Sequence, residues 1–155
     1  MDKYTILLGV LLLSGLSSAN GFDDPRLGQM YRDMDCRIQY TNELLGYAEG
    51  YLCSYSYYYC YDYYDWDTYY LLQGCIDDLD NEDYLLYNYA RATDYAGFNS
   101  EASITRGFIR TCSRSYRGAA REALQNGWTS VRTVSSDRSN AWNNYRNCLG
   151  IGGPG

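Results

Sequence analysis

The sequence predicts an all-α fold, a small bundle of four to five helices held together by three disulfide bonds. Two observations support this prediction. Apolar residues recur at steps of three, four or seven along several stretches, which is the spacing of one face of a helix. The chain also holds six cysteines and no histidine. An even number of cysteines in a small secreted chain is typical of a disulfide framework.

The N-terminus has the features of a secretory signal peptide. Lys3 provides a positive charge, and the apolar stretch that follows ends in small residues at Ala19. Neither this stretch nor any later one has the roughly 18 apolar residues of a membrane span. We therefore expect residues 1–19 to be cleaved and residues 20–149 to form one secreted, extracellular domain without membrane contact. Residues 150–155 are rich in glycine and are expected to form a disordered tail.

Capping residues and apolar stripes place the helices along the chain. Asp24 and Pro25 form a typical helix start. A stripe of Ile104, Phe108, Cys112, Ser115, Ala119 and Ala123 marks a later helix. The expected helices are residues 25–53, a helix capped by Asp65 or Asp67 that reaches Ile76, one from Asp80 or Asn81 to Gly97, one from Ser100 or Ser103 to Asn126, and one from Asp137 to Gly150.

The cysteine positions favour one pairing among the 15 that six cysteines allow. Bridged residues in an antiparallel hairpin of helices lie at similar distances from its turn. This rule fits one hairpin that turns near residues 55–58. Elimination then leaves Cys112 for Cys148, and their turn falls within a loop expected at residues 128–136. The predicted pairs are Cys36–Cys75, Cys53–Cys60 and Cys112–Cys148. A zinc site is not expected, because the chain lacks both histidine and any Cys-x-x-Cys pair.

Charge divides the chain into two parts. Residues 22–100 contain 15 acidic residues and 4 arginines, whereas residues 101–155 contain 3 acidic residues and 8 arginines. The overall charge of −6 argues against nucleic acid as a partner. The two parts are expected to attract each other, within one molecule as the favoured alternative or between molecules.

The composition also argues against catalysis. Without histidine there is no Ser-His-Asp or Cys-His arrangement, and cysteines in disulfides offer no thiol nucleophile. A pair of carboxylates remains an alternative, but no acidic residue is singled out by the sequence. We expect no enzyme activity, no cofactor and no specific metal ion.

Tyrosine is the most unusual feature of the sequence. Eleven of the 24 residues from Tyr47 to Tyr70 are tyrosine, and four of the others are acidic. Consecutive tyrosines cannot all face one core, in a helix or in a strand. Some rings must therefore be exposed, where they offer contact surface or sites of hydroxylation, coupling or sulfation. These contact or modification candidates are Tyr57, Tyr58, Tyr59, Tyr61, Tyr63, Tyr64, Tyr69 and Tyr70.

Two further runs are charged. The segment Asp77–Asp83 packs five acids into seven residues but lacks the glycine and glutamate of an EF-hand loop. It predicts at most weak Ca²⁺ attraction through Asp77, Asp78, Asp80, Glu82 and Asp83, against the alternative of a solvated acidic turn. Arginines at helical spacing form a ridge that is expected to pair with these acids, or else to bind a sulfated glycan or a neighbouring chain. The ridge consists of Arg106, Arg110, Arg114, Arg117 and Arg121.

The leader, the tyrosines of Tyr55–Tyr70 and the acids of Asp77–Asp83 together resemble the tyrosine-rich, acidic matrix proteins of invertebrate shells and cuticles. The resemblance is one of composition and transfers no site residues. It implies an extracellular structural protein that contacts other matrix macromolecules, copies of itself or a mineral surface. The alternative is a secreted helical module that binds an apolar ligand or a protein partner. A mostly exposed tyrosine face favours the first function, and a large apolar cavity favours the second.

Overall fold

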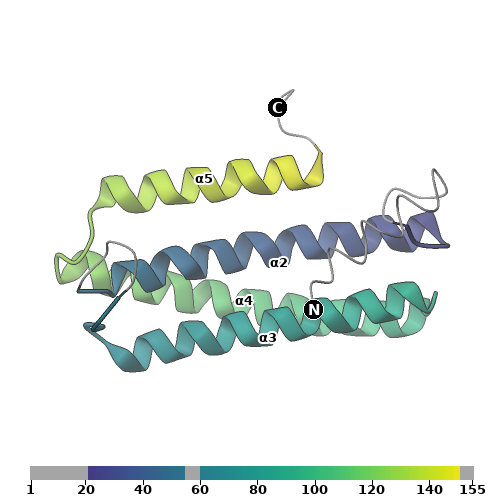
Figure 1. The fold of residues 1–155 in the computed structure, drawn as a ribbon, viewed down its shortest axis with the longest axis horizontal. Helices are drawn as coiled ribbons and strands as arrows, with labels where there is room; N and C mark the ends of the chain where they lie inside the picture. Colours follow the sequence, from purple (N-terminus) through teal and green to yellow (C-terminus); the bar gives the residue numbers. More distant parts are fainter. Residues whose placement is uncertain (1–20, 55–59, 151–155) are drawn as a thin grey trace.

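A computed structural model describes residues 21–54 and 60–150 of the 155-residue chain. These residues form an all-α fold, as predicted, and consecutive helices run antiparallel along one long axis (Figure 1). The expected signal peptide and residues 151–155 of the expected tail lie outside the described residues. The helices are α2 (Pro25–Tyr51), α3 (Trp66–Arg91), α4 (Tyr95–Gln125) and α5 (Val131–Leu149).

Each helix begins at a side chain that accepts a hydrogen bond from the first turn. The carboxylate of Asp24 accepts from the N–H of Arg26 at 2.9 Å, and that of Asp65 accepts from the N–H of Thr68 at 3.1 Å. Asp94 and Ser130 cap α4 and α5 in the same way. The predicted first helix is confirmed to within two residues, and Asp65 is confirmed as one of the two proposed caps.

Helix α3 is continuous where the sequence predicted a break, so the start expected at Asp80 or Asn81 was wrong. The reason is its buried stripe, which keeps one helical phase through this region. Capping residues end a helix only where the apolar stripe also stops, and here it does not. The stripe consists of Leu72, Cys75, Leu79, Glu82, Leu86 and Ala90.

Helix α4 begins earlier than predicted, at Tyr95 rather than near Ser100. Gly97 does not end the preceding helix but lies in the first turn of α4. A Cβ atom at this position would lie 2.5 Å from ring carbons of Tyr89, so glycine allows that ring to cover the turn. Buried residues of α4 alternate at steps of four and three, a heptad pattern. They include Phe98, Ala102, Thr105, Ile109, Cys112, Tyr116, Ala119 and Ala123.

The predicted face of α4 was partly wrong, because Ile104 is 49% exposed. The loop predicted at residues 128–136 was also too long, because α5 begins at Val131 instead of after Asp137. Ser130 caps α5, and its hydroxyl accepts from the N–H of Thr133 at 3.1 Å. The predicted end of α5 at Gly150 is confirmed, since this residue has the left-handed conformation of a C-cap (φ 81°).

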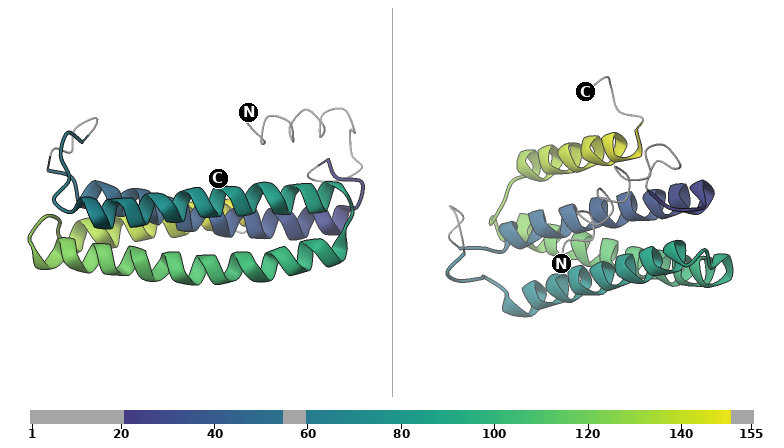
Figure 2. Two further views of the ribbon diagram at one scale, coloured as in Figure 1. Left: turned by 90° about the horizontal axis from the view of Figure 1, so that it is seen from below. Right: turned by 45° about the vertical axis from the view of Figure 1, so that its right-hand side comes forward.

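Helices α2, α3 and α4 pack against one another around the core, and α5 packs mainly against α2 (Figure 2). Ala141 is the only residue of α5 that is fully buried. Within the described part of the chain, no helix combines the length and apolar character that crossing a membrane requires.

Tyrosine hydroxyls join the helices through acidic side chains. Tyr31 on α2 donates a 2.6 Å hydrogen bond to Asp83 on α3, in the interior. Tyr51 near the end of α2 donates to Asp137 on α5, also at 2.6 Å, and burial raises the pKa of this phenol. Such pairs satisfy the polar tip of a ring that contributes apolar area to the core.

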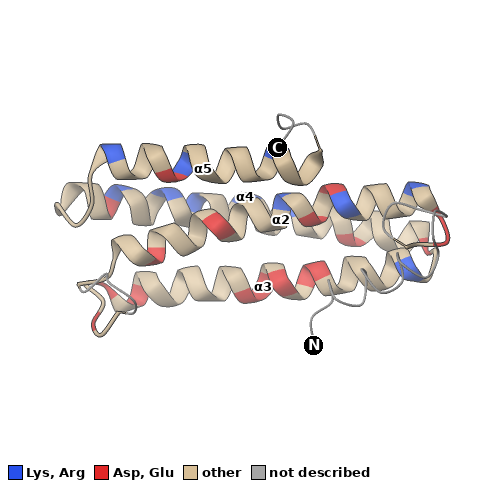
Figure 3. Ribbon diagram, turned by 45° about the horizontal axis from the view of Figure 1, so that its top comes forward, with Lys and Arg blue, Asp and Glu red and all other residues tan. Residues whose placement is uncertain are grey.

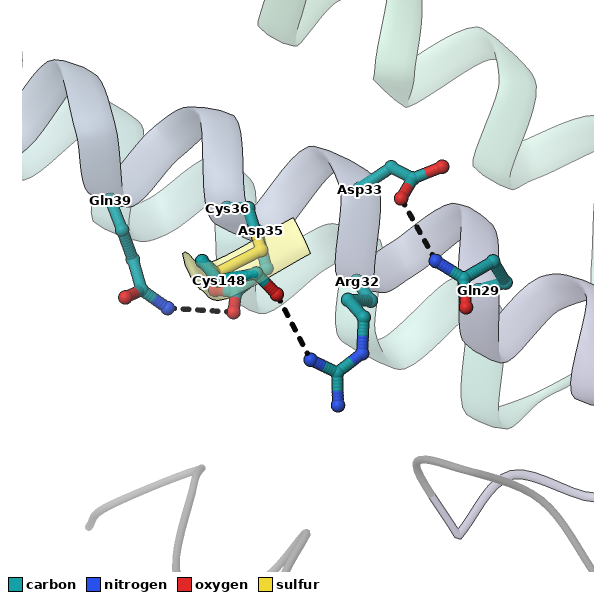
Figure 4. The surroundings of a disulfide bond; sticks show 7 residues. All are labelled: Gln29, Arg32, Asp33, Asp35, Cys36, Gln39 and Cys148. Atoms are coloured by element: carbon teal, nitrogen blue, oxygen red, sulfur yellow. Dashed lines mark hydrogen bonds between the residues drawn. A yellow bond between two sulfur atoms is a disulfide. The ribbon is translucent and has the colours of Figure 1, made fainter. Parts of the chain in front are cut away.

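The disulfide bonds differ from the predicted pairing in two of three cases. Cys53–Cys60 is confirmed. The predicted pairs Cys36–Cys75 and Cys112–Cys148 were wrong. The observed bonds are Cys36–Cys148, which joins α2 to α5 (Figure 4), and Cys75–Cys112, which joins α3 to α4.

These two pairs were predicted wrongly because the sequence analysis placed a break inside the segment that forms helix α3. Without that break, Cys75 and Cys112 lie at matching distances from the turn between α3 and α4, so they face each other in this hairpin. Cys36 is then left for Cys148, on the helix that covers the outer side of α2. Arg32 supports this contact by donating to the carbonyl oxygen of Cys148 at 3.3 Å.

Removing Cys36–Cys148 should destabilise the protein more than removing Cys53–Cys60. The first bond spans 112 residues and the second spans seven. In the chain-entropy model these separations correspond to about 5 and about 2 kcal/mol. Urea unfolding of the Cys36→Ser/Cys148→Ser and Cys53→Ser/Cys60→Ser variants measures the difference. Equal losses of unfolding free energy in the two variants would contradict the disulfide assignment. So would a disulfide-linked Cys36–Cys75 peptide in a digest of the unreduced protein.

Candidate functional site

The described part of the tyrosine-rich segment is held in place at one end of the bundle. Cys53–Cys60 closes a short loop, and residues 52–54 pair with residues 62–64. The N–H of Tyr64 donates to the carbonyl of Leu52 at 2.8 Å, and the N–H of Ser54 donates to that of Asp62 at 2.9 Å. The segment that follows Cys60 therefore has a defined conformation.

Six aromatic residues gather at this end and form what we call the aromatic cluster: Tyr63, Tyr64, Trp66, Tyr69, Tyr70 and Trp128. Tyr63 stacks on Tyr69 with 4.0 Å between ring centroids, and Trp66 contacts both of these rings and that of Tyr70. Trp128, from the turn between α4 and α5, stacks on Tyr64 at 4.4 Å. The ring contacts form two groups at this end of the bundle. Tyr63, Trp66, Tyr69 and Tyr70 make up one, and Tyr64 pairs with Trp128, from a turn that is distant in sequence, in the other.

Much of this aromatic surface faces solvent. Tyr70 is 62% exposed, Tyr64 47% and Trp66 42%, and the neighbouring Tyr61 is 67% exposed. Tyr63 and Tyr69 are half-buried against the core. Burial, followed by the neighbouring Tyr69, raises the pKa of Tyr63 to about 12.

Acidic residues border the aromatic cluster. Asp62 and Asp67 are exposed, and Asp62 accepts a hydrogen bond from the indole N–H of Trp66 at 3.3 Å. Of the eight tyrosines predicted as contact candidates, Tyr61, Tyr63, Tyr64, Tyr69 and Tyr70 lie together here. Tyr57, Tyr58 and Tyr59 lie outside the described residues.

The five acids of the segment Asp77–Asp83 do not converge on one point, because they lie along the continuous helix α3. Asp77, Asp78 and Asp80 are exposed, whereas Glu82 and Asp83 are buried. Among the residues that the structure describes, no group of three ligand-type side chains is placed to hold a metal ion. Weak Ca²⁺ attraction therefore stays a prediction, and only the exposed acids are available for it.

The arginine ridge of α4 is exposed along its whole length, from Arg106 to Arg121. Figure 3 shows these basic residues on α4 and the acidic residues on α3. The ridge arginines are exposed, as are Asp77, Asp78 and Asp80, whereas Glu82 and Asp83 are buried. Internal pairing of the ridge with these acids therefore stays a prediction.

Carboxyl groups do meet at two places between α3 and α4. Glu82 and Glu101 form one pair, beside the hydroxyl of Thr105, which lies 3.2 Å from Glu82. Asp65 and Glu122 form the other, beside the hydroxyl of Thr68. The hydrogen bond with Glu122 lowers the pKa of Asp65, and the same contact raises that of Glu122.

In each pair, one carboxyl group raises the pKa of the other across two helices. Burial, followed by the hydrogen bond and the negative charge of Glu101, raises the pKa of Glu82 to about 7. Both pairs are of the kind that general acid–base catalysis uses. Glu82 is only 6% exposed, whereas Asp65 and Glu122 are half-buried, and the groove described below is lined by none of the four acids. Both pairs make contact between helices.

Comparison of the chain with protein-family models, curated protein sequences and solved structures gives no match.

Sequence reasoning missed two members of the aromatic cluster. Trp66 was read only as part of a biased segment, although its position directly after the Asp65 cap places it in the first turn of α3. Trp128 belongs to the cluster because α4 returns the chain to the same end of the bundle. Its position after the predicted helix end at Asn126-Gly127 was the available signal, since residues after that end lie near the start of α3 in an antiparallel pair.

The protein should lose stability as the pH rises from 5 to 8. Glu82 has a folded pKa of about 7, above its ordinary value of 4.5, so the folded state binds an extra proton in this range. This contribution is complete below about pH 4.5 and is lost as the pH rises through 7. The expected loss is about 1–3 kcal/mol, measured by urea unfolding at each pH.

The Glu82→Gln variant should be less sensitive to pH over this range and more stable than the wild type at pH 8. Glutamine keeps the hydrogen-bonding shape of a protonated carboxyl but cannot ionise. Asp77→Asn, an exposed substitution on the same helix, is the control and should keep the wild-type pH dependence. If the free energy of unfolding of Glu82→Gln changed with pH in parallel with that of the wild type, the raised pKa of Glu82 would be contradicted.

Proposed function

We propose that the protein is a secreted extracellular matrix component that associates with other macromolecules through its aromatic cluster and the acids around it. The supporting observation is that Tyr64, Trp66 and Tyr70 stay 42–62% exposed while their rings are held by ring-to-ring contacts. Exposed aromatic surface of this extent marks a contact site more often than a folding requirement.

The geometry favours binding because the exposed rings are held in place before contact. Ring stacking, the Cys53–Cys60 loop and the cap at Asp65 restrict the segment. Rigid aromatic side chains provide a large contact area at low cost in conformational entropy. Three disulfides fit an oxidising compartment, as the extracellular space is.

The bordering acids indicate which partners suit this surface. Asp62 and Asp67 are exposed next to the rings and give this end of the molecule a negative charge. Suitable partners are basic matrix macromolecules, the arginine ridge of a second copy, or a calcium-bearing mineral surface. No catalytic step, cofactor or nucleic-acid partner forms part of the proposal.

Replacing exposed rings should weaken association. The variant Tyr61→Ser/Tyr64→Ser/Tyr70→Ser removes three exposed phenols outside the core. We expect roughly tenfold or greater loss of affinity, because buried aromatic anchors dominate most interfaces. Sedimentation velocity over a concentration range measures self-association, and co-sedimentation with chitin, with a basic fibrous protein and with calcium carbonate particles measures the other partners.

Tyr84→Ser is the matched control, since Tyr84 is 48% exposed on α3 but has no part in the aromatic cluster. It should bind like the wild type. Equal binding by the triple variant and the wild type would remove the support for this site, as would the absence of association in every assay.

Intact mass tests whether the phenols are modified as well as exposed. Hydroxylation or sulfation of the candidate tyrosines adds mass to the secreted protein, and coupling joins chains covalently. The mass of an unmodified chain with three disulfides, from a protein that stays monomeric, would overturn modification but leave non-covalent association open to the binding assays.

A further inference from the structure

A groove runs along α5, beside the end of α4 and Tyr40 of α2. Its volume is about 910 Å³, within the size range of small-molecule sites. Apolar side chains form much of its surface. They are Tyr40, Leu124, Val131, Val134 and Trp142.

Helix α5 is tied to the bundle on its α2 side, which leaves the other side open. Cys148 is bonded to Cys36, and Asn144 donates to Glu43 at 2.9 Å. Towards the groove, by contrast, Val131 is 73% exposed and Trp142 is 47% exposed. Trp142 is held by the ring of Tyr40, 6.0 Å away between centroids, so one wall of the groove is ordered.

The charged lining of the groove is positive in a chain whose net charge is −6. Arg138 lines the groove together with the neutral polar residues Ser135, Ser139 and Asn143, and no acid belongs to the lining. The nearby carboxylate of Asp137 already accepts the hydrogen bond from Tyr51.

Further positive charge lies along the α4 side. Arg117 and Arg121 precede the groove residue Leu124 by seven and three residues, a spacing that places them on the same face of the helix. Both arginines are exposed. The groove therefore combines apolar walls with a cationic edge.

We propose that this groove binds a small amphipathic anion, a single-chain carboxylate of the fatty-acid type. Its hydrocarbon tail lies against Val131, Val134 and Trp142, and its carboxylate contacts the guanidinium of Arg138. Apolar walls alone accept any oily molecule, whereas the arginine without a competing acid selects the anionic head. The site is separate from the aromatic cluster, and neither proposal depends on the other.

Fluorescence titration with a dansyl-labelled undecanoate, followed by displacement with palmitate or with 1-hexadecanol, tests the proposal. Both competitors have the same chain length and are used below their aggregation limits. We expect micromolar displacement by palmitate and at least roughly tenfold weaker displacement by the alcohol, since a charge-assisted hydrogen bond is lost. Equal displacement by both would overturn the role of the charge.

Two variants locate the site. Arg138→Gln and Val131→Asp should each weaken probe binding roughly tenfold or more, because one removes the positive charge and the other adds a repelling one. Arg106→Gln is the control. It removes an arginine of the α4 ridge that lies about five helical turns from Leu124, and this variant should bind the probe like the wild type. Circular dichroism confirms that each variant is folded.

Three outcomes would overturn the proposal: no probe binding by the wild type, equal losses in Arg138→Gln and Arg106→Gln, or dimerisation that Val131→Asp abolishes in the absence of probe binding. The last outcome would assign the groove to a second copy of the chain. Binding by the Tyr61→Ser/Tyr64→Ser/Tyr70→Ser variant at wild-type affinity is expected, which separates this site from the matrix function.

Discussion

The hydrogen bond between a tyrosine hydroxyl and a carboxylate of another helix is the interaction on which this bundle depends. It joins α2 to α3 through Tyr31 and Asp83, and α2 to α5 through Tyr51 and Asp137. A third such bond, from Tyr95 to Asp24, connects the first turn of α4 to the cap of α2. A chain with few aliphatic residues can bury tyrosine instead, provided that most buried hydroxyls find an acceptor.

This requirement explains why tyrosine and acid are abundant together. The hydroxyl of a buried ring such as Tyr31 needs a buried acceptor such as Asp83. Some of the tyrosines and some of the acids therefore lie in the core. The tyrosines that stay at the surface are fewer than the composition alone indicates. Tyr61, Tyr64 and Tyr70 are among them, and Tyr84 is exposed elsewhere on α3.

Local signals in the sequence were sufficient for the fold class, the start at Pro25, the cap at Asp65 and the Cys53–Cys60 bond, because each depends on neighbouring residues. The other two predicted disulfide pairs were wrong because such bonds depend on which helices are adjacent in the fold. Asp80 and Asn81 look like a cap, and only packing of the stripe on both sides of them shows that the helix continues. The groove beside α5 could not be predicted either, since it arises from the way that helix covers α2 without filling the space towards α4.

The bond between Cys36 and Cys148 turns most of the chain into a covalent ring. Any single cut of the backbone between these two positions opens the ring without releasing a fragment. The helices would stay joined after such a cut, and their packing could hold the cut ends in place. A protein built in this way tolerates attack by proteases better than its long surface helices would indicate, and it can lose an exposed loop to cleavage while remaining one particle.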